Sequence, residues 1–228
     1  MKILHFDDPA FARRYAEGPA QFVPGYEVMQ RMAAQLLSER AGDDAEILVL
    51  GAGGGLELEA FARLRPGWRY VGVDPSAEML KNARERMEAV GAGDRVTWVQ
   101  SYIGDAPDGP FDGATCLLTL HFVPDDGGKL DTLRQLRARL KPGAAFVLVD
   151  LCIDMAAPDE AARRDRYARF ALESGAEADD VAQTRERLKS VLNCVSAARD
   201  EVLLHEAGFI DIDLFYAGLS WRGWSAIA

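Results

Sequence analysis

The sequence has few cysteines, no long apolar run and a deficit of positive charge. Its three cysteines, Cys116, Cys152 and Cys194, show no CxxC spacing and stand in or near apolar runs, so we expect buried thiols and no metal site. No apolar run approaches the roughly 20 residues that a membrane helix needs. Residues 1–11 also lack the apolar core of a secretory signal. We therefore expect a cytoplasmic protein with no membrane partner.

The charge balance bears on the kind of partner. Acidic residues outnumber Lys plus Arg by 36 to 26, which gives a formal net charge of −10. The overall field of such a chain opposes binding to a phosphate backbone. We therefore expect a small-molecule substrate and no nucleic acid. The 228 residues are enough for one domain with a substantial core.

Short apolar runs alternate with longer amphipathic stretches through the first two thirds of the chain. The runs cover residues 46–50, 69–74, 95–100, 112–118 and 144–151. Leu, Met and Ala recur at helical spacing in the stretches between them, with charged residues opposite. This alternation is typical of a parallel sheet covered by helices.

The last third of the chain has a different pattern. Residues 156–195 contain many charges and alanines but no strand-like run, which indicates an inserted pair of helices. A helical stretch follows at 197–208, and then two strand-like runs separated by a few residues around Gly218. So short a connection permits only an antiparallel pair of strands.

A glycine-rich loop follows the first predicted strand and precedes a helix. Gly51, Gly53 and Gly55 form a GxGxG pattern, in which missing side chains let a ligand approach and N–H groups face it. A plain glycine-rich turn is the alternative. Asp74 ends the second strand, where a carboxylate can accept hydrogen bonds from both ribose hydroxyls of an adenosine-containing cofactor. A dinucleotide fingerprint would have glycine at position 56, but this chain has Leu56, which disfavours a nicotinamide.

With these motifs the chain resembles the class I S-adenosylmethionine-dependent methyltransferases over about residues 40–228. The resemblance is carried by VLGAGGG at 49–55, YVGVDPSAEML at 70–80, FDGATCLLTLHFV at 111–123 and LKPGAAFVLVD at 140–150. It implies a Rossmann-like α/β fold whose seven-stranded sheet has the order 3-2-1-4-5-7-6, with strand 7 antiparallel and helices on both faces. It also implies S-adenosylmethionine as the cofactor.

The resemblance divides the single domain, residues 1–228, into four parts. These are an N-terminal helical lid (1–42), a cofactor-binding core (43–155), a helical insertion after strand 5 (156–195), and a terminal helix with an antiparallel hairpin (196–228).

The family's cofactor contacts transfer to matching positions of this chain. Gly51, Ala52, Gly53 and Gly55 form the loop beside the methionine and ribose, Asp74 binds the ribose diol, and Pro75 flanks the adenine.

Two positions depart from the family pattern. Tyr102 and Ile103 stand where the family usually offers an acid to the adenine amino group, and Asp105 is the alternative source of that acid. Val49 stands where many members carry an acid that helps to hold the cofactor's amino group, and Glu57 is the candidate to compensate.

The flanking segments are similar to the carboxy-S-adenosylmethionine synthases and their methyltransferase relatives. In that subgroup the tyrosine of the PGY segment, here Tyr26, lines the cofactor pocket. The synthases use an asparagine and an arginine to hold the extra carboxylate, and these positions are Leu117 and Leu203 here. Arg199, one helical turn before Leu203, is the possible substitute. The resemblance also implies a homodimer.

Methyl transfer from a sulfonium requires mainly that the acceptor be placed in line with the methyl group. His121 and Asp150 are candidate catalytic residues if the acceptor must lose a proton, although each could simply end a strand or cap a loop. Tyr15 and Tyr26 are candidates to close over the pocket.

We therefore predict a small-molecule methyltransferase. The alternatives are a carboxy-S-adenosylmethionine synthase-like enzyme that uses prephenate, and a non-catalytic S-adenosylmethionine-binding protein. The aromatic residues Phe6, Phe11, Tyr15, Phe22 and Tyr26 form either a helix packed on the sheet edge or a lid that excludes water.

Overall fold

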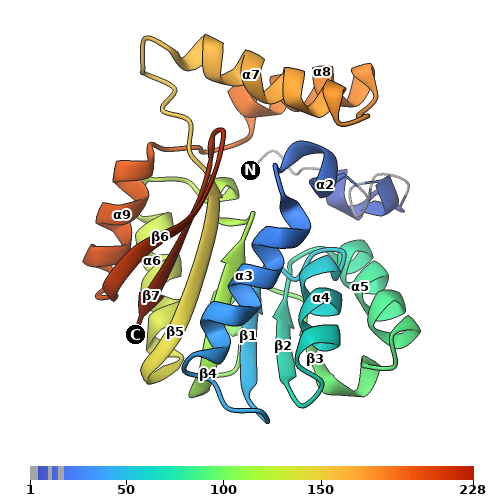
Figure 1. Ribbon diagram of the computed structural model, residues 1–228, viewed down its shortest axis with the longest axis vertical. Coiled ribbons are helices and arrows are strands. Elements are labelled where there is room, and N and C mark those ends of the chain that lie inside the picture. Colours follow the sequence, from blue (N-terminus) through green and yellow to red (C-terminus); the bar gives the residue numbers. More distant parts are fainter. Residues whose placement is uncertain (1–4, 10–11, 15–17) are drawn as a thin grey trace.

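A single mixed sheet organises the chain (Figure 1). The structure is a computed structural model, and it describes residues 5–9, 12–14 and 18–228. The strands are β1 (Glu46–Leu50), β2 (Arg69–Val73), β3 (Val96–Val99), β4 (Phe111–Leu117), β5 (Leu140–Leu151), β6 (Ile210–Gly218) and β7 (Trp221–Ile227). Their order is β3-β2-β1-β4-β5-β7-β6, and β7 is antiparallel to both neighbours. The predicted topology is confirmed.

Helices surround this sheet. They are α2 (Pro19–Phe22), α3 (Tyr26–Ser38), α4 (Leu56–Leu64), α5 (Ala77–Ala89), α6 (Gly128–Ala138), α7 (Glu160–Glu173), α8 (Ala178–Ser190) and α9 (Ala197–Glu206). Short 3-10 turns are η1 (His5–Asp7), η2 (Gly93–Arg95), η3 (Ile103–Asp105) and η4 (Leu120–Phe122). Within the described residues, no helix combines the length and the apolar character needed to cross a bilayer.

The sheet has an apolar core on each face. Ile47 and Val49 of β1 point to the face covered by α3, α4 and α5, and Leu48 and Leu50 point to the face covered by α6 and α9. Successive side chains of a strand alternate between faces, so a strand buried on both sides must be apolar throughout. This is why the predicted strands stood out as continuous apolar runs.

Two helix boundaries follow from the local sequence. The Ser76 hydroxyl accepts a hydrogen bond from the Met79 N–H at 3.2 Å and so caps α5. The turn that ends α5 contains Gly91 with φ +68°, a left-handed conformation that favours glycine. One boundary differs: β5 begins at Leu140 rather than 144, because Phe111 already pairs with Leu140 before the register shifts.

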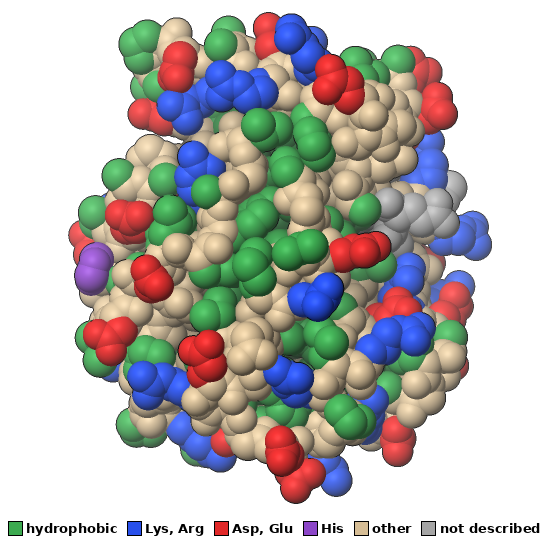
Figure 2. All heavy atoms as spheres, viewed as in Figure 1, with side chains coloured by type: hydrophobic (Ala, Val, Ile, Leu, Met, Phe, Trp, Pro, Cys, Tyr) green, Lys and Arg blue, Asp and Glu red, His purple; other side chains and the backbone are tan. Residues whose placement is uncertain are grey.

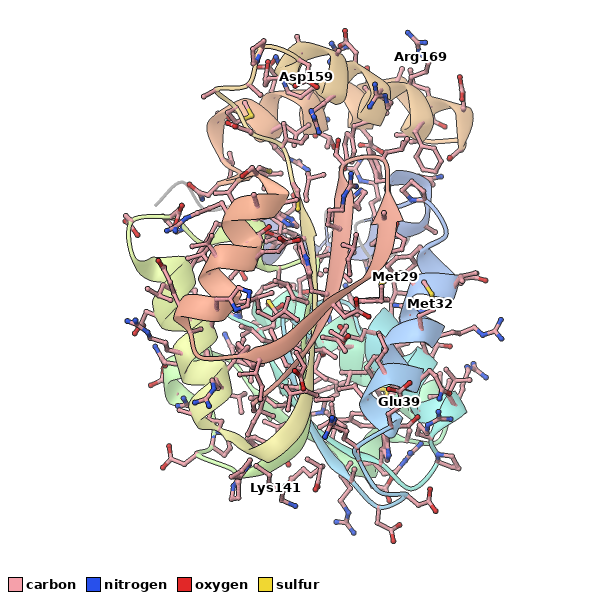
Figure 3. All side chains as sticks on the ribbon, turned by 60° about the vertical axis from the view of Figure 1, so that its left-hand side comes forward. Met29, Met32, Glu39, Lys141, Asp159 and Arg169 are labelled. Atoms are coloured by element: carbon pink, nitrogen blue, oxygen red, sulfur yellow. The ribbon has the colours of Figure 1, made fainter. Side chains whose placement is uncertain are left out.

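The inserted helices α7 and α8 form a hairpin at the upper edge of the sheet, where the parallel strands end (Figure 1). Their small apolar residues, among them Ala168, Ala171 and Val181, pack against Phe22 of α2 rather than against the sheet. Figure 3 shows Arg169 of α7 directed away from the rest of the molecule, so this side of α7 is a solvated face. Acidic and basic side chains are interspersed around a central apolar area in Figure 2.

Replacing Gly55 with Ala should test the close approach of two helices. A Cβ at Gly55 would lie 2.8 Å from the Ala83 Cα of α5, and the residue has φ +80°. We expect G55A to lower the free energy of unfolding by about 2–4 kcal/mol, from backbone strain plus overpacking. Gly175 has φ +88° but open space around it, so G175A isolates the strain and should cost only about 1–2 kcal/mol. Equal losses in urea denaturation would contradict the packing argument.

Candidate functional site

A cavity of about 660 Å³ opens where the parallel strands end, between the glycine loop and the N-terminal segment. Its volume lies within the range of about 300–1,000 Å³ usual for small-ligand sites. All ten residues predicted to bind the cofactor line it: Tyr26, Gly51, Ala52, Gly53, Gly55, Asp74, Pro75, Tyr102, Ile103 and Leu117. Of the predicted aromatic lid, Phe6 and Tyr26 also line this cavity, whereas Phe11 and Tyr15 lie outside the described residues.

Two positions of the glycine loop require glycine for a reason other than the predicted one. A Cβ at Gly51 would overlap the Thr119 side chain, and one at Gly55 would overlap α5, so protein packing itself excludes side chains at both positions. The N–H groups of Gly51 and Ala52 donate to the Val73 carbonyl at 2.9 and 3.0 Å. The expectation that these N–H groups face a ligand is therefore wrong, because they secure the loop to β2.

Asp74 is held by the backbone on either side of it. Its Oδ2 accepts from the Gly53 N–H at 3.0 Å, and its Oδ1 accepts from the Ser76 N–H at 2.9 Å. A carboxylate has about four acceptor sites, so both oxygens keep capacity for ligand hydroxyls. Burial raises the pKa of Asp74, and the two backbone hydrogen bonds offset part of this shift.

The other end of the large cavity is formed by the segment after β3. Ile103 is buried there and Tyr102 is 58% exposed. Asp105, the alternative adenine acid, does not line the cavity and instead accepts a hydrogen bond from the Ser101 hydroxyl. Ser101 is thus the cavity-lining residue that connects to this acid.

A second cavity of about 140 Å³ adjoins the first, and Pro19, Leu118 and Phe122 line both. His121 lines the smaller cavity and is buried. Its Nδ1 lies 2.6 Å from Asp150 Oδ1, which also accepts from the His121 backbone N–H at 2.9 Å. Because Asp150 holds Nδ1, the other ring nitrogen, Nε2, is left for the cavity. The structure thus brings the two predicted catalytic residues together.

Lys129 of α6 completes this buried cluster. Its side chain is fully buried, its Nζ donates to the Leu120 carbonyl at 2.7 Å, and Nζ lies 3.8 Å from Asp150 Oδ2. The cation therefore compensates the charge of Asp150 and secures η4. Asp200 lies buried nearby, where desolvation and the charge of Asp150 raise its pKa.

Aromatic rings line much of the smaller cavity. They come from α2, η4, α7 and β7, and successive ring centroids lie 4.5–6.3 Å apart: Phe22, Tyr167, Trp221, His121 and Phe122. The sequence analysis assigned neither Trp221 nor Tyr167 to a site. No local motif marks either residue, since the wall forms only when distant segments meet.

Comparison with known proteins agrees with the fold and the large cavity. A family profile described as a methyltransferase domain matches residues 48–146. Carboxy-S-adenosyl-L-methionine synthase from Desulfotalea psychrophila is 26% identical over 90% of this chain and 84% of its own length. Residues 48–146 match a methyltransferase domain, and the observed sheet order is the one that the resemblance to the class I S-adenosylmethionine-dependent methyltransferases implies. S-Adenosylmethionine is accordingly its cofactor.

Two further relatives of this methyltransferase match in part. A ubiquinone biosynthesis O-methyltransferase from Xanthomonas campestris is 37% identical over 47% of this chain and 43% of the relative. The solved structure of an O-methyltransferase family 2 protein from Planctomyces limnophilus, in complex with apigenin, has a TM-score of 0.67 at 19% identity. It aligns with 99% of this chain, which spans 62% of that longer protein.

The residues of the large cavity fit S-adenosylmethionine. Asp74 has acceptor capacity for the ribose, and Glu57 lines the cavity with one buried carboxylate oxygen that has no hydrogen-bond partner among the described residues. The adenosyl part would lie between Asp74 and the Tyr102–Ile103 segment, and the amino-acid part toward Glu57. Bound there, the cofactor supplies a methyl group already activated on a sulfonium.

Replacing Asp74 with Asn should weaken cofactor binding. The substitution keeps the side chain's shape but removes the charge and one acceptor oxygen, so we expect the Kd for S-adenosylmethionine to rise about 10- to 100-fold. Asp112 forms a surface pair with Lys141 away from both cavities, and D112N should bind like the wild type. Calorimetric titration measures both, and an unchanged Kd for D74N would remove Asp74 from the site.

Replacing Lys129 with Met should destabilise the fold strongly. The buried Asp150 carboxylate would lose its compensating cation, and breaking such a pair typically costs about 3–5 kcal/mol. Lys141, whose side chain is 49% exposed, also pairs with an acid, but K141M should cost less than about 1 kcal/mol. Urea denaturation of both variants checks this, and a loss for K129M as small as that for K141M would contradict the role given to Lys129.

Proposed function

We propose that this methyltransferase transfers the methyl group to the hydroxyl oxygen of a small single-ring phenol. The observation that carries this proposal is the buried His121–Asp150 pair facing a small aromatic-lined cavity beside the cofactor cavity. Apolar cavities of about 150 Å³ hold one benzene ring. The 140 Å³ cavity therefore has room for one ring, and its aromatic walls suit a planar acceptor.

His121 acts as the general base in this proposal. Nε2 would take the proton of the acceptor hydroxyl, and the cofactor, when bound, would supply the methyl group that the acceptor oxygen receives. The imidazole becomes positively charged, and the Asp150 carboxylate at 2.6 Å stabilises it and holds the ring orientation. The proton thus moves from the acceptor oxygen to His121 and later to solvent.

Two relatives support a ring acceptor. The Xanthomonas protein is named a ubiquinone biosynthesis O-methyltransferase, and a relative from Trichormus variabilis, 31% identical over 127 residues, is named a 2-phytyl-1,4-naphtoquinone methyltransferase. Both names refer to quinone compounds, and the name of the Xanthomonas protein specifies transfer to oxygen. The small cavity of this chain accommodates the ring, and any chain attached to it would have to leave through the cavity mouth.

Carboxylate transfer, the activity named for the Desulfotalea relative, is less well supported. No Lys or Arg is among the described residues that line the large cavity, and the two positions of the synthase pattern, Leu117 and Leu203, are apolar and buried. Arg14 and Arg187 line only the smaller cavity. A buried carboxylate without a charged partner is costly. Arg199 lines neither cavity, and Asp125 binds its guanidinium at 2.9 and 3.0 Å.

Replacing His121 with Gln tests the proposed base. With a panel of mono- and dihydroxybenzenes, we expect wild-type enzyme to form S-adenosylhomocysteine and H121Q to lose about 10²- to 10⁴-fold in kcat. The Kd for the cofactor should stay within a factor of two, because His121 does not line the large cavity. Mass spectrometry quantifies the product.

His205, an exposed histidine at the end of α9, gives the matched control. H205Q should retain wild-type kcat, and D150N should lose activity as H121Q does. Near-normal turnover by H121Q, or turnover of amines but of no phenol, would contradict the proposal. A product of S-adenosylmethionine heavier by a carboxylate, formed when prephenate is supplied, would favour the synthase alternative.

A further inference from the structure

The protein around Glu57 does not account for the burial of this acid. It lies in the first turn of α4, is 7% exposed, and lines the large cavity. Its Oε1 has no hydrogen-bond partner among the described residues, and the same holds for the neighbouring Thr115 Oγ1. Oε1 itself is sealed from the cavity, and the small exposed part of the Glu57 side chain lines it. Buried polar groups are nearly always satisfied, so an acid buried at a cavity wall with an unsatisfied oxygen indicates a ligand group beside it.

Desolvation is the main cause that raises the pKa of Glu57, to about 8, and the Thr115 side chain offsets the shift in part. The acid is therefore largely protonated in the empty cavity at neutral pH. The ionised form of Glu57 is stable in this buried position only beside a cation. Since no Lys or Arg lines the large cavity within the described part of the chain, that cation has to belong to the ligand.

The position of Glu57 indicates which part of the ligand it meets. Val49, which stands where many relatives carry an acid, pairs with Thr115 across β1 and β4. Glu57 places a carboxyl beside Thr115 on this side of the sheet, but from α4 instead of β1. Gln30 and Tyr26 of α3 line the same cavity, where Gln30 Nε2 donates to the Tyr26 hydroxyl at 2.8 Å.

We propose that Glu57 binds the α-ammonium group of S-adenosylmethionine and gives up its own proton when the cofactor binds. The neutral carboxyl and the ligand's ammonium become a carboxylate–ammonium pair, and one proton passes to solvent. This inference rests on the cofactor and is independent of the acceptor proposed above. It makes Glu57 the residue that distinguishes ligands with an amino-acid tail from shorter adenosyl compounds.

The sign of the pH dependence follows from the two groups that titrate. Below pH about 8, Glu57 is protonated in the empty protein, so affinity should rise with pH as the proton becomes easier to release. Above that pH, affinity should fall, because an α-amino group has a pKa of roughly 8 and loses its charge. The binding constant should therefore be greatest near pH 8.

The other titratable or polar groups near Glu57 do not produce this pH dependence of binding. Burial raises the pKa of Tyr70 on β2 and of the Cys116 thiol on β4, so neither ionises between pH 6 and 8. Tyr26 on α3 and Thr115 on β4 are uncharged in this range. Asp74, at the ribose end of the cavity, titrates with a raised pKa but also contacts ligands that lack an amino group.

Calorimetry with two thioether ligands tests the proposal. S-Adenosylhomocysteine carries the amino-acid tail and 5′-methylthioadenosine lacks it, while neither has a sulfonium charge. Titrations at pH 6.5 in phosphate and in imidazole buffer give the number of protons released from the difference in observed heat. We expect S-adenosylhomocysteine to release close to one proton from the wild type and 5′-methylthioadenosine to release none.

Two variants complete the test. E57Q should release no proton and bind S-adenosylhomocysteine about 10- to 100-fold more weakly at pH 8, with unchanged affinity for 5′-methylthioadenosine. Glu59, on the same helix, pairs with Arg63 and Arg86 and lines neither cavity, so E59Q should behave like the wild type.

Three results would overturn the proposal. These are no proton release by the wild type with S-adenosylhomocysteine, undiminished release by E57Q, or an equal loss of affinity for both ligands. The wild-type proton count needs no variant, so it decides the matter even if E57Q folds poorly. Failure of the phenol assay would leave these heats unaffected, whereas failure of both ligands to bind would remove the cofactor site itself.

Discussion

The proposed catalytic geometry depends on the contacts that the buried Asp150 carboxylate makes. It accepts from the backbone N–H of His121, contacts the imidazole, and faces the ammonium of Lys129. Through these contacts it fixes η4, whose Phe122 belongs to the wall shared by the two cavities. A charge with no access to water must keep its partners in place, so the group that would assist proton transfer also fixes the boundary between the two cavities.

Much of the fold and of the large cavity could be predicted from the sequence because their signals are local. The apolar runs are continuous where a strand is buried on both faces, and the glycine loop and Asp74 each follow directly after a strand. The carboxyl ends of neighbouring parallel strands meet at one edge, so these residues had to converge. The reason given for Gly51 and Gly55 was nevertheless incomplete, because neither the Thr119 contact with Gly51 nor the Ala83 contact with Gly55 is visible in the local pattern.

Most of the residues that line the smaller cavity could not be predicted from the sequence. Phe22, Tyr167 and Trp221 come from segments far apart in sequence, and in each segment an aromatic residue looks like ordinary core. Lys129 lies in a helix rich in charged residues, where complete burial has no sequence signature. His121 and Asp150 were found because they stand near the carboxyl ends of the neighbouring strands β4 and β5, but only the structure shows that they contact each other. The sequence also left open whether Glu57 faces the cofactor cavity.

The chain ends are joined by two long-range hydrogen bonds with a consequence for biosynthesis. Tyr216 donates to the Pro24 carbonyl and Trp221 Nε1 to the Phe22 carbonyl, across 192 and 199 residues. The glycine loop and Asp74 leave the ribosome well before Trp221 does, because synthesis runs from the N-terminus. The wall that encloses the proposed acceptor is therefore completed only after the residues proposed to bind the cofactor have been synthesised.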